Sequence, residues 1–221
     1  MQRDASCNQT PFSAGWRTST TVNPIENAVL ELRYEPIADL RGHADIPSEF
    51  EAHSVYAVSE GAHGFEVAER ALGRPFCKNY DVVENPVEWS VALKAVQCIR
   101  ISAFAGSDRV GGVIAAVATP SLVTWETLPN VAVLWDLRVA PAYRRQSVAT
   151  SLLRATCVWA RQVGCAELKV ETQDTNPAAC KFYVRSGFTL VHAQPGAYSE
   201  FPEESQLIWK KSLGVRPIRA A

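Results

Sequence analysis

The sequence predicts one α/β domain built on a mixed β-sheet of about six to seven strands with helices packed against it. Short apolar or alternating segments recur along the chain, separated by turn residues, and two later segments have helical periodicity and end at a glycine. The 221 residues are 47% hydrophobic and 20% charged, with a net charge of −1, which is typical of a globular protein. We expect the domain to span residues 26–213, with a flexible N-terminal segment at 1–25 and a C-terminal tail at 214–221.

The first half of the chain gives the fewest structural signals. Alternation in AVLELRY predicts a strand at 28–34. Residues 38–88 are mixed in character, and the only element expected there is a helix at 64–72. Two strands follow, at 96–104 and 110–118, and the Gly-Ser-Asp sequence between them indicates a turn.

The second half is more regular. Residues 131–139 are mostly apolar and predict a central strand. Residues 148–163 place one apolar stripe at helical spacing, and Gly164 ends this helix. A strand is expected at 166–172, and Asn176-Pro177 supplies the cap and first position of a second helix. That helix stops at Gly187, and the last two strands are expected at 188–192 and 206–210.

Several classes of function fit the sequence poorly. It has no long basic block, so we expect no nucleic-acid partner, and its apolar runs are too short to span a membrane. The N-terminus lacks the apolar core of a secretory signal, and none of the six cysteines forms a C-x-x-C pair. The four histidines, at 43, 53, 63 and 192, are expected in loops or on the surface. We therefore expect a cytoplasmic protein without a metal.

A charged turn joins the central strand to the first long helix. The first N–H groups of a helix have no partner within the helix and attract anions. Arg144 and Arg145 could grip phosphate in a fork, while the small Ser147 and Ala149 would let it approach the backbone. This turn predicts a pyrophosphate cradle. The alternative is a surface turn with solvated arginines.

A second candidate site lies on the second helix. Tyr183 follows Asn176 by two helical turns, so both residues lie near one face and could line a cleft beside the cradle. The alternative is that Tyr183 is a core aromatic residue packing with Phe182 and Phe188.

Together these motifs resemble those of the GNAT superfamily of acyl-CoA-dependent N-acetyltransferases. Residues 139–149 read VAPAYRRQSVA, which is similar to V-x-P-x-[YFH] followed by [QR]-x-x-G-x-[GA]. Residues 176–188 read NPAACKFYVRSGF and resemble N-x-x-A-x-x-[FL]-Y-x-x-x-G-F. Residues 171–188, ETQDTNPAACKFYVRSGF, look closest to streptothricin acetyltransferases. Two positions depart from these patterns: Ser147 replaces the middle glycine, which matters if φ is positive there, and Trp135 replaces an acid beside Asp136.

The resemblance covers roughly residues 95–210 and implies a GNAT fold with a splayed central strand pair. It also implies direct acetyl transfer from acetyl-CoA to a primary amine of a small cationic molecule, with a streptothricin-type antibiotic as one candidate. A polyamine, an aminoglycoside, a protein lysine or a protein N-terminus stays open as the acceptor. A catalytically silent acyl-CoA-binding module is a further alternative. Dimers are common in the superfamily, so a homodimer is compatible with the resemblance.

The resemblance also implies roles for individual residues. Tyr183 would protonate the departing thiolate, and Asp136 would take the proton of the amine. Glu171 is the second candidate for this base, and the alternative for Asp136 is a structural acid paired with Arg138. Asn176 would contact the pantetheine arm. Because the transfer would be direct, no acetyl-cysteine intermediate is expected at Cys180. The expected cofactor contacts are the backbone of Leu137, Arg138 and Val139, and the cradle residues Arg144, Arg145, Gln146, Ser147, Val148, Ala149 and Thr150.

The acceptor pocket is expected to be acidic, because it would bind a cation. The acids available for it are Asp81, Glu84, Glu88, Glu126, Glu200, Glu203 and Glu204.

Overall fold

Seven strands form the main sheet of the computed structural model, which describes residues 29–62, 64–123 and 130–214. Their spatial order is β1-β4-β5-β6-β7-β9-β8, and every neighbouring pair is antiparallel except β6 and β7. The strands are β1 (Leu30–Tyr34), β4 (Cys98–Ala105), β5 (Asp108–Val117), β6 (Val131–Val139), β7 (Glu167–Gln173), β8 (Thr189–Pro195) and β9 (Ser205–Ser212). The predicted mixed sheet is confirmed. The segment expected at 1–25 lies outside the described residues, as does the tail expected at 214–221 apart from Gly214, so the domain limits stay a prediction.

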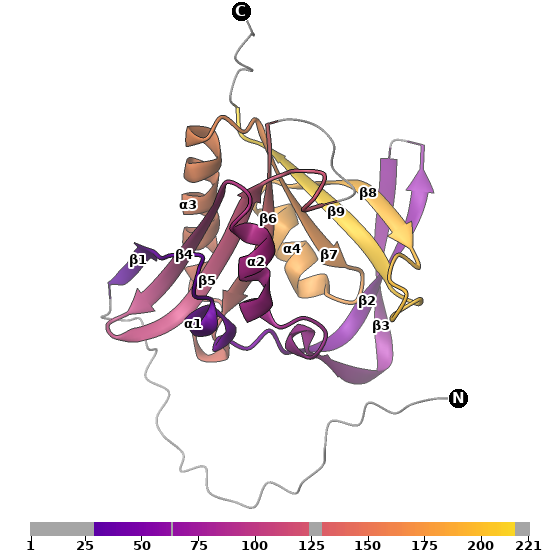
Figure 1. Ribbon diagram of the computed structural model, residues 1–221. Coiled ribbons are helices and arrows are strands. Elements are labelled where there is room, and N and C mark those ends of the chain that lie inside the picture. The colour runs from indigo at the N-terminus through magenta and orange to yellow at the C-terminus, as the bar shows by residue number, and fades with distance from the viewer. Residues whose placement is uncertain (1–28, 63, 124–129, 215–221) are drawn as a thin grey trace, which may run out of the picture.

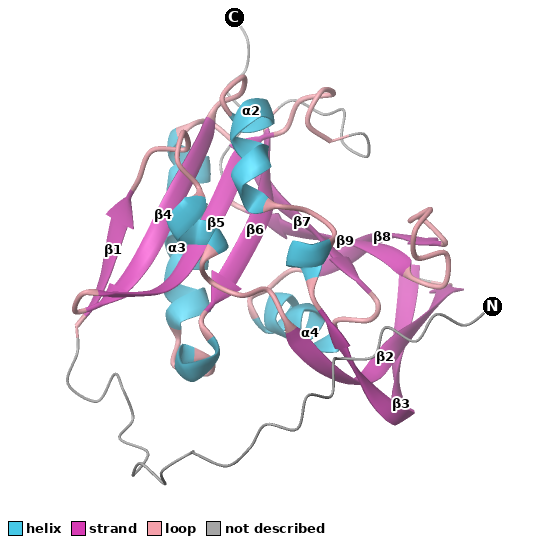
Figure 2. Ribbon diagram, turned by 60° about the horizontal axis from the view of Figure 1, so that its bottom comes forward, coloured by secondary structure: helices cyan, strands magenta, loops and turns pink. Residues whose placement is uncertain are grey.

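Helices cover both faces of the sheet (Figures 1 and 2). The long helix α3 (Val148–Gln162) lies on one face with α4 (Pro177–Arg185), while the short α1 (Arg41–Ala44) and α2 (Trp89–Leu93) lie on the other. The predicted stripe of α3 holds it there, since Leu152 and Thr156 are fully buried. Burying one leucine side chain stabilises the fold by about 1.5–3 kcal/mol. Short 3₁₀ turns occur at η1 (Tyr80–Val82), η2 (Pro86–Glu88) and η3 (Pro141–Tyr143).

Two adjacent glycines in β5 let helices approach the sheet from both sides. A Cβ on Gly111 would lie 2.8 Å from Val148 of α3, and a Cβ on Gly112 would lie 2.6 Å from Nδ1 of His43 in α1. Both distances are shorter than a nonbonded contact allows. The missing side chains therefore bring α3 and His43 against the strand that neighbours β6.

The helix expected at 64–72 is wrong. This segment belongs to β3 (Gly64–Lys78), which pairs with β2 (Phe50–Gly61) in a separate two-stranded sheet. The run AERAL holds strong helix formers, but backbone pairing with β2 overrides this local preference. The resulting hairpin extends beside β8 at one end of the main sheet (Figure 1).

The central strands β6 and β7 separate halfway along their length. They pair from Val131↔Glu167 to Leu134↔Val170 and no further. A bulge at Trp135 shifts the register of β6, which then continues along β5 to Val139, while β7 stays with β9. The expected splayed pair is present, and it leaves a gap inside the sheet.

Candidate active site

A cavity of about 300 Å³ occupies the gap between β6 and β7, and we call it the gap cavity. It is bounded by the separated halves of the two strands, the start of α4, and the segment around Pro47 and Ser48. Eight residues predicted from the sequence meet around it: Asp136, Leu137, Arg138, Val139, Arg144, Ala149, Asn176 and Tyr183. The second candidate base, Glu171, also lines it.

The ladder between β5 and β6 decides which peptide groups face this gap. Ala140 N–H donates to Val110 O at 2.9 Å, and antiparallel pairing alternates from there. The peptide groups of Asp136 and Arg138 therefore point to β5, and those of Leu137 and Val139 point into the gap. Of the three backbone contacts expected from the sequence, Leu137 and Val139 have peptide groups that face the gap, whereas the Arg138 peptide pairs with β5.

The turn before α3 has the backbone of an anion cradle. Ser147 has φ of 64° and Arg145 has φ of 66°, both in the left-handed region. Ser147 occupies the N-cap without a side-chain capping bond. The N–H groups of residues 148–150 have no protein partner within the described part of the chain. These donors and the positive end of the helix are open to an anion.

A larger cavity of about 850 Å³, the helix groove, continues from this turn along α3 and α4. Arg145 lines it and has no ion pair or hydrogen bond among the described residues, so its guanidinium is available to a ligand. The other basic residues lining the groove are Arg144, Arg154, Arg161, Arg185 and Lys211. The groove suits an extended anionic ligand.

Two cradle side chains form hydrogen bonds within the protein. Arg144 donates from Nε to Val139 O at 3.1 Å and from Nη2 to Glu49 O at 2.9 Å, so it ties the cradle to the end of β6. Gln146 donates to Ala142 O at 2.8 Å and lines neither the gap cavity nor the helix groove. Both side chains therefore stabilise the loop before α3, and the Val139 carbonyl already accepts a hydrogen bond from Arg144.

The strained serine in the cradle gives a testable prediction. An L-residue in the left-handed region costs about 1–2 kcal/mol, and glycine avoids most of this penalty at some cost in chain entropy. We expect Ser147→Gly to raise the free energy of unfolding by up to about 1 kcal/mol without weakening acetyl-CoA binding. Denaturant unfolding and calorimetric titration measure the two quantities. A clear loss of stability would show that the serine side chain makes a compensating contact.

Tyr183 combines its two expected roles. Its ring packs against Phe182 and Phe188, with both pairs of centroids 5.2 Å apart, so the core interpretation is correct for the ring. The residue also lines the gap cavity, and no described residue hydrogen-bonds its hydroxyl. Burial raises the pKa of Tyr183, and the Asp136 carboxylate raises it further. A hydroxyl that keeps its proton and has no internal partner can donate to a ligand in the gap.

Asp136 belongs to a buried ion network. His43 Nε2 and Arg138 Nε both lie 2.6 Å from Asp136 Oδ2, and Arg138 Nη1 lies 2.6 Å from Asp81 Oδ1. Burial disfavours the charged form of Arg138, but Asp136 and Asp81 outweigh it, so the pKa of the guanidinium is raised. The Oδ2 atom of Asp136 is therefore paired with Arg138, as the structural alternative expected. Among the described residues, no hydrogen bond uses the other oxygen.

A third cavity, of about 310 Å³, lies on the other side of the splayed strands, and we call it the aromatic cavity. Its aromatic residues are Tyr80, Trp89, Trp135, Tyr198 and Phe201, and its acids are Glu84, Asp136, Glu171 and Glu204. It shares seven residues with the gap cavity: Tyr80, Leu134, Trp135, Asp136, Arg138, Glu171 and Gln173. The two cavities therefore meet at the point where β6 and β7 separate.

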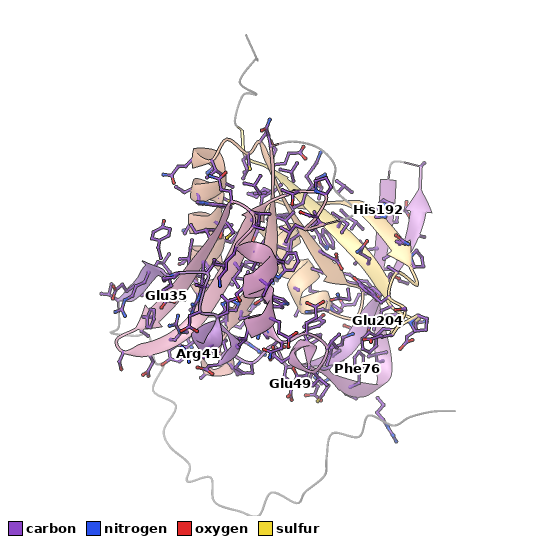
Figure 3. All side chains as sticks on the ribbon, viewed as in Figure 1. Glu35, Arg41, Glu49, Phe76, His192 and Glu204 are labelled. Carbon is purple, nitrogen blue, oxygen red and sulfur yellow. The ribbon has the colours of Figure 1, made fainter. Side chains whose placement is uncertain are left out.

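A buried ion pair closes one side of the aromatic cavity. Lys78 Nζ lies 2.5 and 2.6 Å from the two carboxylate oxygens of Glu204, and 4.1 Å from the centre of the Phe201 ring. Figure 3 shows Glu204 where the β8–β9 connection approaches the hairpin. The pair joins two segments that are remote in sequence. Glu204 is thus neutralised by the protein itself.

Several site residues carried no signal in the sequence. His43 was expected in a loop or on the surface, but it is fully buried, because α1 turns it against Gly112 and Asp136. Asp81 pairs with Arg138 and does not line the aromatic cavity, whereas Glu84 and Glu204 do. Glu126 lies outside the described residues. Tyr80 and Tyr198 belong to no motif found in the sequence, whereas Gln173 lies in the quoted stretch 171–188 without an assigned role.

Cys180 is fully buried beside Thr172, and burial raises the pKa of its thiol to about 11. A thiol of this kind is almost entirely protonated at neutral pH and is a poor nucleophile. Within the described ranges, no three His, Cys, Asp or Glu side chains are grouped closely enough to hold a metal ion. None of the described helices is long and apolar enough to span a bilayer.

Comparison with known proteins identifies the class to which this fold and site belong. Residues 77–188, about half of the chain, match the model of the acetyltransferase (GNAT) family. The chain belongs to this family. The resemblance drawn from the two sequence motifs is confirmed.

Its relatives include proteins named as acetyltransferases of streptothricin and of aminoglycosides. Streptothricin acetyltransferase A of Bacillus subtilis is 36% identical over 76 residues, which are 34% of this chain and 44% of that protein. Aminoglycoside N(6')-acetyltransferase type 1 of Klebsiella aerogenes is 44% identical over 62 residues, 28% of this chain and 41% of that protein. The matches thus span less than half of either relative. Streptothricin acetyltransferase of Escherichia coli is 26% identical over 168 residues, 75% of this chain and 86% of that protein.

Solved structures share the fold across most of the chain. Nourseothricin acetyltransferase superposes with a TM-score of 0.66 at 21% identity, covering 83% of this chain and 98% of the other. A protein from Bacillus anthracis, named as a streptothricin acetyltransferase and solved in complex with acetyl coenzyme A, gives 0.68 at 20% identity, covering 83% and 99%. At these identities the likeness establishes the fold alone.

Proposed function

We propose that this acetyltransferase moves the acetyl group of acetyl-CoA to a primary amine of a small cationic molecule. One observation supports this most strongly: two cavities of different chemistry meet at the separated strands β6 and β7. The gap cavity leads to a basic cradle and groove, whereas the aromatic cavity is acidic. The acetyl donor and the amine would reach the junction from these two sides.

The acetyl-CoA would lie along the basic side. Its pyrophosphate would bind the open N–H groups of residues 148–150, and its pantetheine arm would enter the gap beside Asn176. Leu137 N–H and C=O and Val139 N–H point into the gap and could pair with the arm like a neighbouring strand. One of these N–H groups would hold the thioester oxygen as negative charge develops on it.

Arg145 offers a direct test of this orientation, because it lines the groove and no described residue pairs with it. We expect Arg145→Ala to weaken acetyl-CoA binding by about tenfold, the loss of one exposed charge-assisted contact, with kcat at saturation nearly unchanged. Calorimetric titration gives the Kd. Arg74→Ala, on the exposed hairpin, is the matched control and should bind like the wild type. Equal affinity in both variants would place the phosphates elsewhere.

The reaction needs one base and one acid at the junction. At pH 7.4 only about one lysine-like amine in a thousand is neutral, which adds roughly 4 kcal/mol to the barrier. Asp136 and Glu171 both line the two cavities, and either carboxylate could take the proton. Tyr183 would protonate the departing thiolate. The protonated Cys180 supports direct transfer.

The aromatic cavity suits a cation. Aromatic faces and carboxylates both attract ammonium groups. This cavity combines five aromatic residues with four acids. Of these acids, Glu204 is paired with Lys78 and Asp136 with Arg138, while Glu84 forms no ion pair with any described residue. Two relatives are named for streptothricin and one for aminoglycosides, so a streptothricin-type antibiotic is the first acceptor to try and an aminoglycoside the second.

The experiment is CoA release from acetyl-CoA, followed with a thiol reagent, with streptothricin, an aminoglycoside, a polyamine and a lysine peptide in parallel. We expect the strongest signal with streptothricin. A signal with another amine alone would keep the chemistry and replace the acceptor. Silence with all four, while acetyl-CoA still raises the Tm, would favour the silent acyl-CoA-binding module over the enzyme proposed.

A further inference from the structure

A chain of hydrogen bonds runs along the wall of the aromatic cavity. The Tyr80 hydroxyl donates to Gln173 Oε1 at 2.6 Å, and Gln173 Nε2 donates to the Tyr198 hydroxyl at 3.2 Å. The Tyr198 hydroxyl in turn donates to Glu171 Oε1 at 2.7 Å. The four residues come from η1, β7 and the β8–β9 connection, and all four line the cavity.

The strand geometry explains why the chain faces the cavity. Glu171 and Gln173 are two residues apart on β7, so their side chains lie on the same face of the sheet. Thr172 between them points to the opposite face, where it contacts Cys180 of α4.

The direction of these bonds leaves the Tyr198 oxygen able to accept. Its proton is directed to Glu171, and one of its two lone pairs receives the Gln173 amide. The second lone pair is left for a donor from the cavity. An ammonium group would be such a donor.

We propose that Tyr198 relays a proton from the acceptor ammonium to Glu171. This rests on the function proposed above. In the step, an ammonium N–H bond breaks and its proton passes to the Tyr198 oxygen, while the phenolic proton of Tyr198 passes to Glu171. The freed nitrogen lone pair then attacks the thioester carbon. When the C–S bond breaks, the thiolate takes the proton of Tyr183. The second proton of the attacking nitrogen then returns to the Tyr183 oxygen as the neutral amide forms, and Glu171 later releases its own proton to solvent.

The charges around the cavity favour Glu171 over Asp136 as the final proton acceptor. The other titratable groups lining it are Lys78, Tyr80, Glu84, Asp136, Arg138 and Glu204. Lys78 is paired with Glu204, while Arg138 is shared between Asp136 and Asp81. Arg138 Nε lies 2.6 Å from Asp136 Oδ2, whereas Glu171 Oε1 accepts from the Tyr198 hydroxyl, which is the group that would deliver the proton.

Tyr198 itself cannot be the final base. Burial raises the pKa of its phenol, and the neighbouring Glu171 carboxylate raises it further. It can therefore pass a proton on only by giving up its own at the same time. Its position depends on the connection that also holds Phe201 and Glu204, which the Lys78 ion pair fastens to β3.

The test compares wild type, Tyr198→Phe, Glu171→Gln and the double variant, with the amine that the wild type acetylates best. The measurement is kcat/KM for this amine from pH 6 to 10, at saturating acetyl-CoA, with the Kd of acetyl-CoA as a check of folding. Tyr34→Phe, on the exposed end of β1, is the matched control. If the wild type acetylates no amine, the proposed function fails, which is distinct from failure of the relay.

At pH 7 we expect each single variant to lose about 100-fold in kcat/KM, the lower end of what a positioned proton transfer contributes, with the Kd of acetyl-CoA unchanged. The double variant should lose no more than either single one, because the two residues act as a unit. The wild-type profile should level off well below the pKa of the amine. The variants should instead keep rising about tenfold per pH unit toward pH 10, because only amine already neutral in solution can react.

Three outcomes would overturn the relay: wild-type rates in Tyr198→Phe, losses that add in the double variant, or a lowered rate with an unchanged pH profile. The last would mark Tyr198 as structural. A profile altered by Asp136→Asn and by neither relay variant would assign the base to Asp136.

Discussion

Replacing Tyr183 with phenylalanine should lower kcat about 100-fold while leaving the Kd of acetyl-CoA within about twofold of the wild type. The ring would keep its packing against Phe182 and Phe188, so the fold is preserved. Only the hydroxyl is lost, and it has no hydrogen-bond partner among the described residues. Its one expected partner is the sulfur leaving the thioester. Steady-state kinetics and calorimetric titration separate the two quantities.

Phe182→Leu serves as a comparison, since it alters the ring packing and keeps the hydroxyl. It should reduce stability more than Tyr183→Phe and reduce kcat less. An unchanged kcat in Tyr183→Phe would remove this residue as the acid. A weakened Kd with normal kcat would make it a binding residue instead.

The second large effect concerns stability. Arg138→Leu should lower the free energy of unfolding by about 3 kcal/mol or more, because it leaves the carboxylates of Asp136 and Asp81 without their shared cation. Arg138 is 4% exposed, so water cannot readily replace it. Urea or guanidinium unfolding measures the change.

Arg41→Leu is the control for this prediction. Arg41 also pairs with an aspartate, Asp39, at 2.8 Å, but both side chains are more than half exposed. Such pairs contribute at most about 1 kcal/mol. Similar losses in the two variants would mean that burial of the Arg138 network does not matter to the fold.

The elements and site residues that could be predicted from the sequence are those that depend on contacts between residues close together in the chain. The order β6, α3, β7, α4 followed from periodicity, caps and two motifs, since each of these signals spans only a few residues. The positive φ considered for Ser147 is present because the turn into α3 requires it locally. The eight residues around the gap cavity could be named for the same reason.

The rest depends on contacts between distant segments. Lys78 and Glu204 are 126 positions apart and Asp136 and His43 are 93 apart, and neither sequence neighbourhood indicates a partner. The helix expected at 64–72 is instead part of β3, because backbone pairing with β2 outweighs the helix propensity of AERAL. Tyr198 joins Glu171 only after the β8–β9 connection folds over the sheet. The fold class was therefore predictable from the sequence, while the contacts that form the aromatic cavity were not.

The opening between β6 and β7 also bears on solubility. A strand with unpaired peptide groups is normally a template for aggregation, which proteins avoid at sheet edges with charges, prolines or short strands. Here the unpaired stretch of β6 lies in the interior of the sheet, closed at one end by Leu134↔Val170 and flanked by α4. A narrow, unbranched molecule fits into the gap cavity, whereas a polypeptide strand, with side chains on both faces, would clash with the residues that line it. The protein thus offers strand-like bonding to a small molecule without offering it to another copy of itself.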